Sequence, residues 1–167
     1  MTTVATLSLQ ERMFTVYAAY GRAMMAAHSL ERRLAALLVT RAADRRSSKE
    51  IFHAEQAEID HLTLGPLIKR FISEFQPEER LVEELDNMLY FRNDLTHRIS
   101  DLVLRAAQQE QWEARVLTEL TDITEYFRET REMLEPYAAK WFAKYAVSEH
   151  ELLTKALAMY PGIKRGS

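Results

Sequence analysis

The stretch LQERMFTVYAAYGRAMMAAHSLERRLAALLVT, residues 9–40, decides the fold. It contains no proline, and Gly21 is its only glycine. Apolar side chains recur three and four positions apart along it, as an α-helix with one buried face requires. At about 3.6 residues per turn, the stretch makes about nine turns. We therefore expect one long amphipathic helix, whose buried stripe consists of Met13, Val16, Tyr20, Ala23, Ala27, Leu30, Leu34 and Leu37.

The next part of the 167-residue chain has the same helical character. The chain has only four Gly and four Pro, and residues that lose little freedom in a helix outnumber the β-branched ones. The pattern predicts a short helix over residues 49–61 and another that starts at Gly65-Pro66. A longer helix starts at Gln76-Pro77, and we expect a bend in the chain near residues 100–105.

The last third of the chain predicts two more helical segments. A second long helix is expected over residues 107–147, with Pro136 either kinking or splitting it. Residues 148–151 fit a capping box in front of a final helix. Because no linker or repeat separates these segments, we predict a single all-α domain over residues 1–167. Its expected architecture is a helical bundle of five to seven helices with two long helices.

Charge and composition exclude several classes of protein. The formal net charge is −3 and the pI about 6.0, which argues against the broad cationic surface of a protein that coats nucleic acid. A local basic site is compatible with these values. The chain has no cysteine, so it forms neither a disulfide nor a thiolate zinc site. No window approaches the roughly 20 apolar residues of a membrane span, and residues 1–10 lack a signal-peptide pattern. We expect a soluble cytoplasmic protein with no membrane partner.

A short polar run, Arg92-Asn93-Asp94-Leu95-Thr96-His97, interrupts the apolar stripe of the helix that follows Pro77. Cutting RNA without a metal requires a base for the 2′-hydroxyl proton, an acid for the leaving 5′ oxygen and a cation for the phosphate. A histidine, with an ordinary pKa of about 6.5, exchanges protons at cellular pH, and a guanidinium matches phosphate oxygens. His97 and Arg92 therefore suit these catalytic tasks.

The segment Tyr90-Phe91-Arg92-Asn93-Asp94-Leu95-Thr96-His97-Arg98 resembles the R-N-x-x-x-H motif of the HEPN superfamily. The resemblance implies a helical bundle with the activity of a metal-independent endoribonuclease, as in bacterial toxin–antitoxin and phage-defence systems, although the superfamily also includes non-catalytic versions. It implies that Arg92 and His97 act with their copies across a homodimer interface, that Asn93 supports them, and that RNA and an antitoxin are the partners. In toxins of this superfamily that an adenylating partner protein silences, a Tyr occupies the position of Ile99 in this chain. The resemblance therefore does not extend to inhibition by adenylation.

The spacing of Arg92 and His97 sets a geometric condition on such a site. On a continuous helix, residues five apart diverge by about 140°, so the two side chains cannot stand side by side. Either the helix is broken within Asn93 to His97, or the two residues converge with their counterparts from another chain. One histidine per chain is also too few for both proton transfers, whereas a symmetric dimer supplies two copies.

Three further residues are candidates for supporting the site. His28 and Glu31 are three apart in a second stripe of the first predicted helix. They can line the same cleft as Arg92, pair across a dimer, or form a hydrogen-bonded pair at the edge of the core. Glu31 is the best candidate for an acidic partner of Arg92. Tyr90 shares a helix face with His97.

Two other hypotheses remain open from the sequence. In the first, Arg92 forms a structural salt bridge, His97 is hydrogen-bonded near a helix end, and the chain is a non-catalytic binding or assembly module. In the second, Glu58-Ile59-Asp60-His61 supplies the Glu-x-x-His pairing of ferritin-like di-iron bundles. That site needs a second such pair, and Asp94 to His97 is only an approximation to one. We therefore expect neither a metal nor another cofactor.

Overall fold

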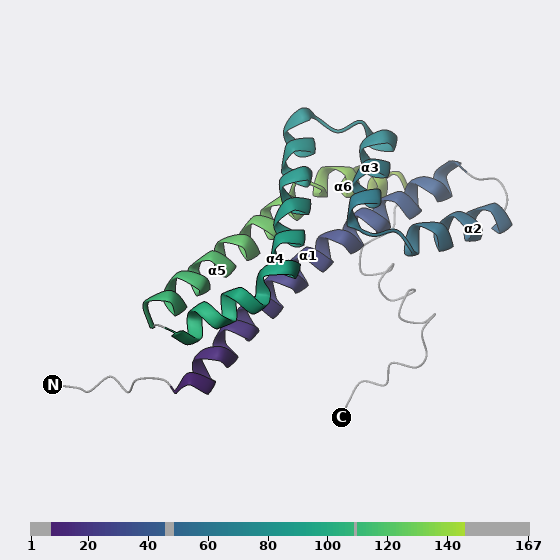
Figure 1. Ribbon diagram of the computed structural model, residues 1–167. Coiled ribbons are helices and arrows are strands. Elements are labelled where there is room, and N and C mark those ends of the chain that lie inside the picture. The colour runs from purple at the N-terminus through teal and green to yellow at the C-terminus, as the bar shows by residue number, and fades with distance from the viewer. Residues whose placement is uncertain (1–7, 46–48, 109, 146–167) are drawn as a thin grey trace, which may run out of the picture. The chain divides into compact units, whose positions relative to one another are not determined.

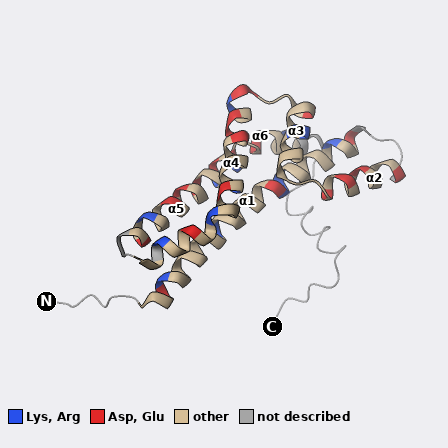
Figure 2. Ribbon diagram, in the orientation of Figure 1, with Lys and Arg blue, Asp and Glu red and all other residues tan. Residues whose placement is uncertain are grey.

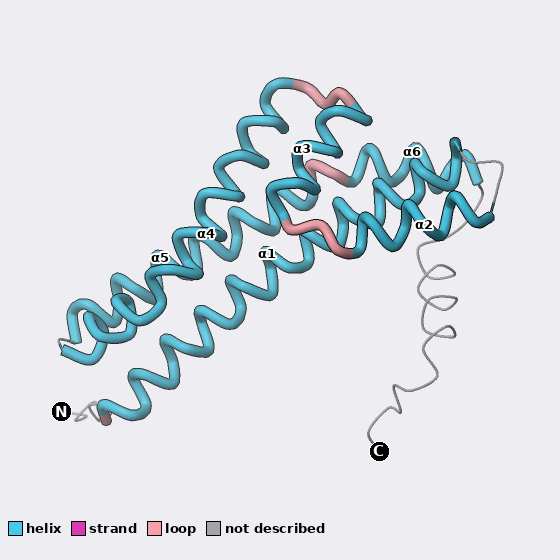
Figure 3. Tube along the Cα trace, turned by 45° about the vertical axis from the view of Figure 1, so that its right-hand side comes forward, coloured by secondary structure: helices cyan, strands magenta, loops and turns pink. Residues whose placement is uncertain are grey.

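The computed structural model describes residues 8–45, 49–108 and 110–145, and every regular element within them is an α-helix. Figure 3 shows these helices joined by short loops, without a strand among the described residues. The prediction of an all-α bundle of five to seven helices is therefore confirmed. The helices are α1 (Leu9–Arg45), α2 (Lys49–Asp60), α3 (Leu64–Phe75), α4 (Glu79–Gln108), α5 (Glu110–Glu132) and α6 (Glu135–Tyr145) (Figure 1).

The chain divides into two compact units after Met133. The first unit contains α1 to α5, and the second contains α6. Because α5 ends at Glu132 and α6 begins at Glu135, Pro136 lies in the first turn of a new helix, where its missing N–H costs least. Of the two arrangements expected around Pro136, the split one is correct. The single domain over residues 1–167 stays a prediction.

Within the first unit, α1 is the central element, since it packs against α2, α3, α4 and α5. The helix α4 in turn packs against α1, α3 and α5. Burying an aliphatic side chain contributes about 1.5–3 kcal/mol, so these faces supply most of the stabilisation of the unit. Many of the buried side chains on α1 belong to its predicted stripe, namely Val16, Ala23, Ala27, Leu30, Leu34 and Leu37. The buried stripe of α4 consists of Leu81, Leu85, Met88, Leu95 and Leu102.

The helix α4 is longer than expected. It remains helical through residues 100–105, where a bend in the chain was expected, and ends only at Gln108. The physical reason is that this segment has neither Pro nor Gly and that Leu102 and Val103 are buried, so the apolar stripe extends past Ser100. The prediction of one long helix over residues 107–147 is wrong. The first residues of this range belong to the end of α4, the middle forms α5, and the last described residues form α6. The capping box at 148–151 lies outside the described residues.

The charged side chains are unevenly distributed over the first unit. Figure 2 shows acidic residues on α2 and at the beginning of α4, which includes Glu79, Glu83 and Glu84. A polyanion would be repelled by this region and would favour other parts of the surface. Among the described residues, no helix combines the length and apolar character that crossing a bilayer requires.

Candidate functional site

The polar run of the HEPN-like motif lies on an unbroken part of α4. Leu95 is buried and anchors this part of the helix to the core, whereas Asn93 and His97 are exposed. Thr96 Oγ1 donates a hydrogen bond to the carbonyl oxygen of Arg92, 2.9 Å away, which keeps the side chain of Thr96 against its own helix. The helix is therefore not broken between Asn93 and His97, which was one of the two expected ways to bring Arg92 and His97 together.

Arg92 is held by an acidic residue of the neighbouring helix. Its Nε lies 3.4 Å from Oε1 of Glu31 on α1, with the two side chains 32% and 15% exposed. Glu31 was the expected acidic partner of Arg92. The Nε is buried and makes no hydrogen bond of normal geometry, so the attraction between the two side chains is that of an ion pair. The contact ties α4 to α1 at the point where the apolar stripe of α4 is interrupted.

Glu31 also links Arg92 to a histidine. Its second oxygen, Oε2, lies 3.0 Å from Nδ1 of His28, one turn earlier on α1. His28 is mostly exposed, so this contact places an imidazole at the surface beside the Arg92 ion pair. The structure therefore brings together Arg92, Glu31 and His28, with Asn93 Oδ1 at 3.4 Å from Nη1 of Arg92.

His97 does not belong to this group within one chain. Its side chain is exposed and forms no hydrogen bond or ion pair with any residue that the structure describes. The direction of His97 follows from the unbroken helix, because a position five residues beyond Arg92 points about 140° away from it. A single chain therefore presents an anchored guanidinium and a separate free imidazole, rather than a joined catalytic pair.

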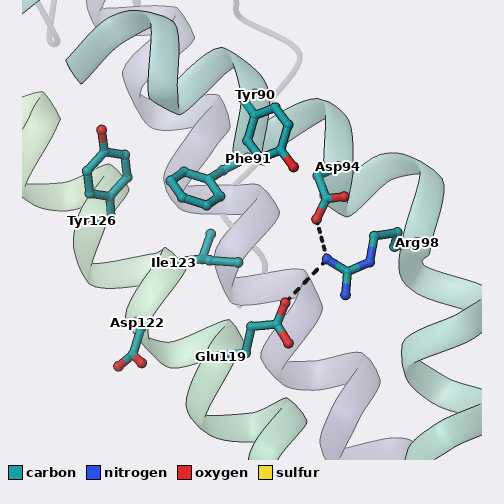
Figure 4. A pocket seen from close by; sticks show the side chains of 8 residues that line it. All are labelled: Tyr90, Phe91, Asp94, Arg98, Glu119, Asp122, Ile123 and Tyr126. Atoms are coloured by element: carbon teal, nitrogen blue, oxygen red, sulfur yellow. Dashed lines mark hydrogen bonds and ion pairs between the residues drawn. The ribbon is translucent and has the colours of Figure 1, made fainter. Parts of the chain in front are cut away.

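Tyr90 lies in a groove between α4 and α5 rather than with Arg92. Figure 4 shows this groove, which has a volume of about 400 Å³. Arg98 of α4 bridges the two helices that line the groove, since its Nη1 lies 2.6 Å from Oδ2 of Asp94 on α4 and 3.5 Å from Oε1 of Glu119 on α5. The hydrogen bond to Asp94 raises the pKa of Arg98. The groove is lined by Tyr90, Phe91, Asp94, Arg98, Glu119, Asp122, Ile123 and Tyr126.

The groove between α4 and α5 is acidic overall, since three carboxylates face one guanidinium. At its side, the hydroxyl of Tyr126 donates to a carboxylate oxygen of Glu84, and burial raises the pKa of Tyr126. A phosphate would be repelled here, so Tyr90 does not share a phosphate site with Arg92 within the chain. The ion pair of Asp94 with Arg98 was not predicted, although a spacing of four residues is a recognisable sign of an ion pair on a helix.

The Glu-x-x-His segment takes part in a salt-bridge cluster between α2 and α3. The guanidinium of Arg70 binds Glu55, lies 3.3 Å from Glu58 Oε1 and 3.0 Å from Glu74 Oε1. Burial works against the charged form, but these carboxylates more than compensate and raise the pKa of Arg70. A cation of the chain itself thus occupies the centre of the carboxylates, and His61 is exposed at the end of α2. Within the described ranges, no group of three or more His, Asp or Glu is arranged to hold a metal ion.

The exposed face of α1 carries large apolar side chains. Phe14 is 74% exposed and Met25 is 71% exposed, and the two residues lie about three turns apart on the same helix face. Half-exposed Tyr17 belongs to the same surface, and a Cβ at Gly21 would meet no atom within 4 Å. We call Phe14, Tyr17, Gly21 and Met25 the α1 surface. Contiguous exposed apolar side chains of this kind are typical of interaction sites.

No protein-family model, curated protein or solved structure matches the chain. The resemblance to the HEPN superfamily therefore rests on Arg92, Asn93 and His97 and on the helical layout around them.

Proposed function

We propose that the chain is a metal-independent endoribonuclease of the HEPN type that acts as a homodimer. The observation that supports it most is the different state of the two motif side chains. Arg92 is fixed by Glu31, as a residue that binds a phosphate must be, and His97 is free and exposed, as a residue that exchanges protons with a substrate must be.

The proposed reaction assigns each motif residue a role. His97 of one chain removes the proton of the 2′-hydroxyl, whose oxygen attacks the phosphorus and forms a 2′,3′-cyclic phosphate. The 5′ oxygen leaves and takes a proton from the second copy of His97, so that protons and charges balance. Arg92 stabilises the negative charge on the phosphate during the attack, and Asn93 orients the phosphate through its exposed amide.

A homodimer is required because one chain supplies only one His97 and points it away from Arg92. The α1 surface is the proposed contact between the two copies, since Phe14 and Met25 are exposed on the helix that also carries Glu31. A twofold interface is self-complementary, so one apolar helix face can cover its own copy. The proposed setting is a cytoplasmic toxin or phage-defence factor that an antitoxin neutralises.

A second candidate function is that of a non-catalytic binding or assembly module. The observation in its favour is the same ion pair, because a guanidinium satisfied by Glu31 and separated from His97 also serves to join α1 and α4. In this case the exposed His97 takes no part in catalysis. The two candidates differ in whether the exposed imidazole matters for RNA cleavage.

The experiment is an RNA cleavage assay with excess EDTA, with the wild type, His97→Ala and His61→Ala. His61 is a matched control, because its side chain is also exposed but lies at the end of α2. We expect cleavage by the wild type and by His61→Ala, and a loss of at least about a hundredfold in His97→Ala. Equal cleavage by both variants, or none by the wild type, would reject the ribonuclease and leave the binding module.

A further inference from the structure

A second groove of the first unit lies between α1 and α5 and has a basic lining. Its volume is about 350 Å³. Three arginines and one glutamate contribute to it, so the charged groups of the lining sum to +2 in a chain whose net charge is −3. Four residues of each helix line the groove, namely Arg22, Met25, Ala26 and Ser29 of α1 and Thr124, Arg128, Arg131 and Glu132 of α5.

The positive charge of this groove is only partly neutralised by the described part of the surrounding protein. Arg128 pairs with Glu125 at 2.9 Å, but neither Arg22 nor Arg131 forms an ion pair with a described residue. The Nε of Arg131 is also buried and has no hydrogen-bond acceptor in the described part of the chain. Because no described carboxylate pairs with them, the guanidinium groups of Arg22 and Arg131 are available to an anionic ligand in the groove.

Arg131 differs in this respect from the other arginines whose Nε is buried. Arg92 lies 3.4 Å from Glu31, and Arg12 and Arg33 have other partners. Only Arg131 combines a desolvated Nε with the absence of any ion pair among the described residues. The unsatisfied guanidinium therefore belongs to the groove and is not a general property of the arginines in this fold.

The chemistry of the lining matches a phosphodiester backbone. Guanidinium groups bind phosphate oxygens through paired N–H donors, and the hydroxyl of Ser29 supplies a further donor. Ala26 adds a small apolar contact beside these donors, whereas Met25 belongs to the α1 surface that is proposed as the dimer contact. A cationic groove without a set of base-reading amides is suited to contacts with the phosphate backbone, which carry no sequence information.

The groove also has a suitable position relative to the motif. On α1, Ser29 lines the groove and Glu31 holds Arg92. Residues two apart in a helix differ by about 200° in direction and by about 3 Å along the axis. The two features therefore flank α1 on opposite sides, about one helix diameter or 10–12 Å apart. The exposed side chain of His28 lies on the face between them. A strand that passes His28, which lies about one turn beyond Met25 and the α1 surface, can contact both the groove and Arg92.

We propose that the groove between α1 and α5 binds the phosphates of single-stranded RNA and guides the strand across α1 toward Arg92. This inference deepens the proposed ribonuclease function and rests on RNA being the substrate. The groove holds the backbone only, and the bond that is cut lies at the motif.

The test measures binding of a fluorescein-labelled oligouridylate by fluorescence anisotropy, in a His97→Ala background so that the RNA stays intact. The groove variant is Arg22→Gln with Arg131→Gln, and the control is Arg80→Gln, an exposed arginine of the first turns of α4. Gln has nearly the helix propensity of Arg, and circular dichroism verifies that the fold is kept. We expect the groove variant to bind roughly tenfold or more weakly, and its salt slope, d log K/d log[salt], to be smaller in magnitude by about 1.4, since each single-strand phosphate contact accounts for about 0.7.

The outcomes separate this inference from the proposed function. Unchanged affinity and salt slope in the groove variant overturn the groove as an RNA site, even if the otherwise wild-type chain cleaves RNA. Equal displacement of the RNA by polyglutamate and by unlabelled oligouridylate also overturns it, because the groove would then prefer carboxylates as much as phosphates. If the groove variant loses RNA binding while the otherwise wild-type chain cuts no RNA, the groove stands and the ribonuclease fails.

Discussion

Nε of Arg92 on α4 and Oε1 of Glu31 on α1 lie 3.4 Å apart, and this contact fills the one break in the apolar stripe of α4 between Met88 and Leu95. The two side chains are mostly shielded from water, so their attraction is screened less than that of a surface pair. The same contact fixes the direction of the motif arginine. The ion pair therefore has a structural consequence, which is measurable without any assumption about function.

We expect Glu31→Gln to lower the free energy of unfolding by about 1–2 kcal/mol, because it leaves the partly buried Arg92 without its charged partner. Urea unfolding followed by circular dichroism measures the change. Glu125→Gln is the matched control, since the pair of Glu125 and Arg128 is exposed on both sides and should contribute less than about 0.5 kcal/mol. Equal effects of the two substitutions would show that the Arg92 pair is an ordinary surface contact.

The α1 surface should determine self-association. We expect Phe14→Glu with Met25→Glu to raise the dissociation constant of the homodimer at least about tenfold, because each substitution places a charge in an apolar contact. Sedimentation velocity over a range of concentrations measures this constant. The control is Ile51→Glu, at a side chain that is 51% exposed on α2. A wild-type chain that stays monomeric, or a variant that dimerises as well as the wild type, contradicts the proposed interface.

Tyr126 should make the stability of the fold sensitive to high pH. Burial and the contact with Glu84 raise the pKa of Tyr126 above its ordinary value of 10.0, so the folded state favours the neutral phenol. The resulting stabilisation is complete below the pKa of the unfolded chain and is lost as the pH rises above it. We expect the free energy of unfolding of Tyr126→Phe to fall less steeply above roughly pH 10 than that of the wild type. Parallel curves for the two proteins in this range would contradict the buried environment of the phenol.

Much of the fold could be predicted from local patterns. The stripe from Val16 to Leu37 predicts α1 because its spacing, free of proline, allows only a helix with one buried face. Pro136 allowed two arrangements, since proline both kinks helices and starts them, and only packing selects between these outcomes. The extent of α4 was missed, although Leu102 continues its apolar stripe, because the local sequence from Ser100 to Arg105 does not distinguish a bend from a continuous helix.

The candidate site was predictable in its residues but not in its arrangement. The pairing of Glu31 with Arg92 could be anticipated from an arginine in an apolar stripe, since such a charge needs a partner. The separation of His97 from Arg92 follows once the helix is known to be unbroken. The basic groove gave no local signal, because Arg22 and Arg131 come from opposite parts of the chain and meet only when α1 packs against α5.

The central claim is that two copies of His97 from different chains form one site. The most direct test refolds wild-type chains together with His97→Ala chains at a fixed total concentration and measures RNA cleavage in EDTA. If both copies are needed, only dimers of two wild-type chains are active, so an equal mixture should retain about one quarter of the wild-type activity. The account predicts this dependence on the square of the wild-type fraction. Activity in direct proportion to that fraction, with about one half in the equal mixture, would contradict it.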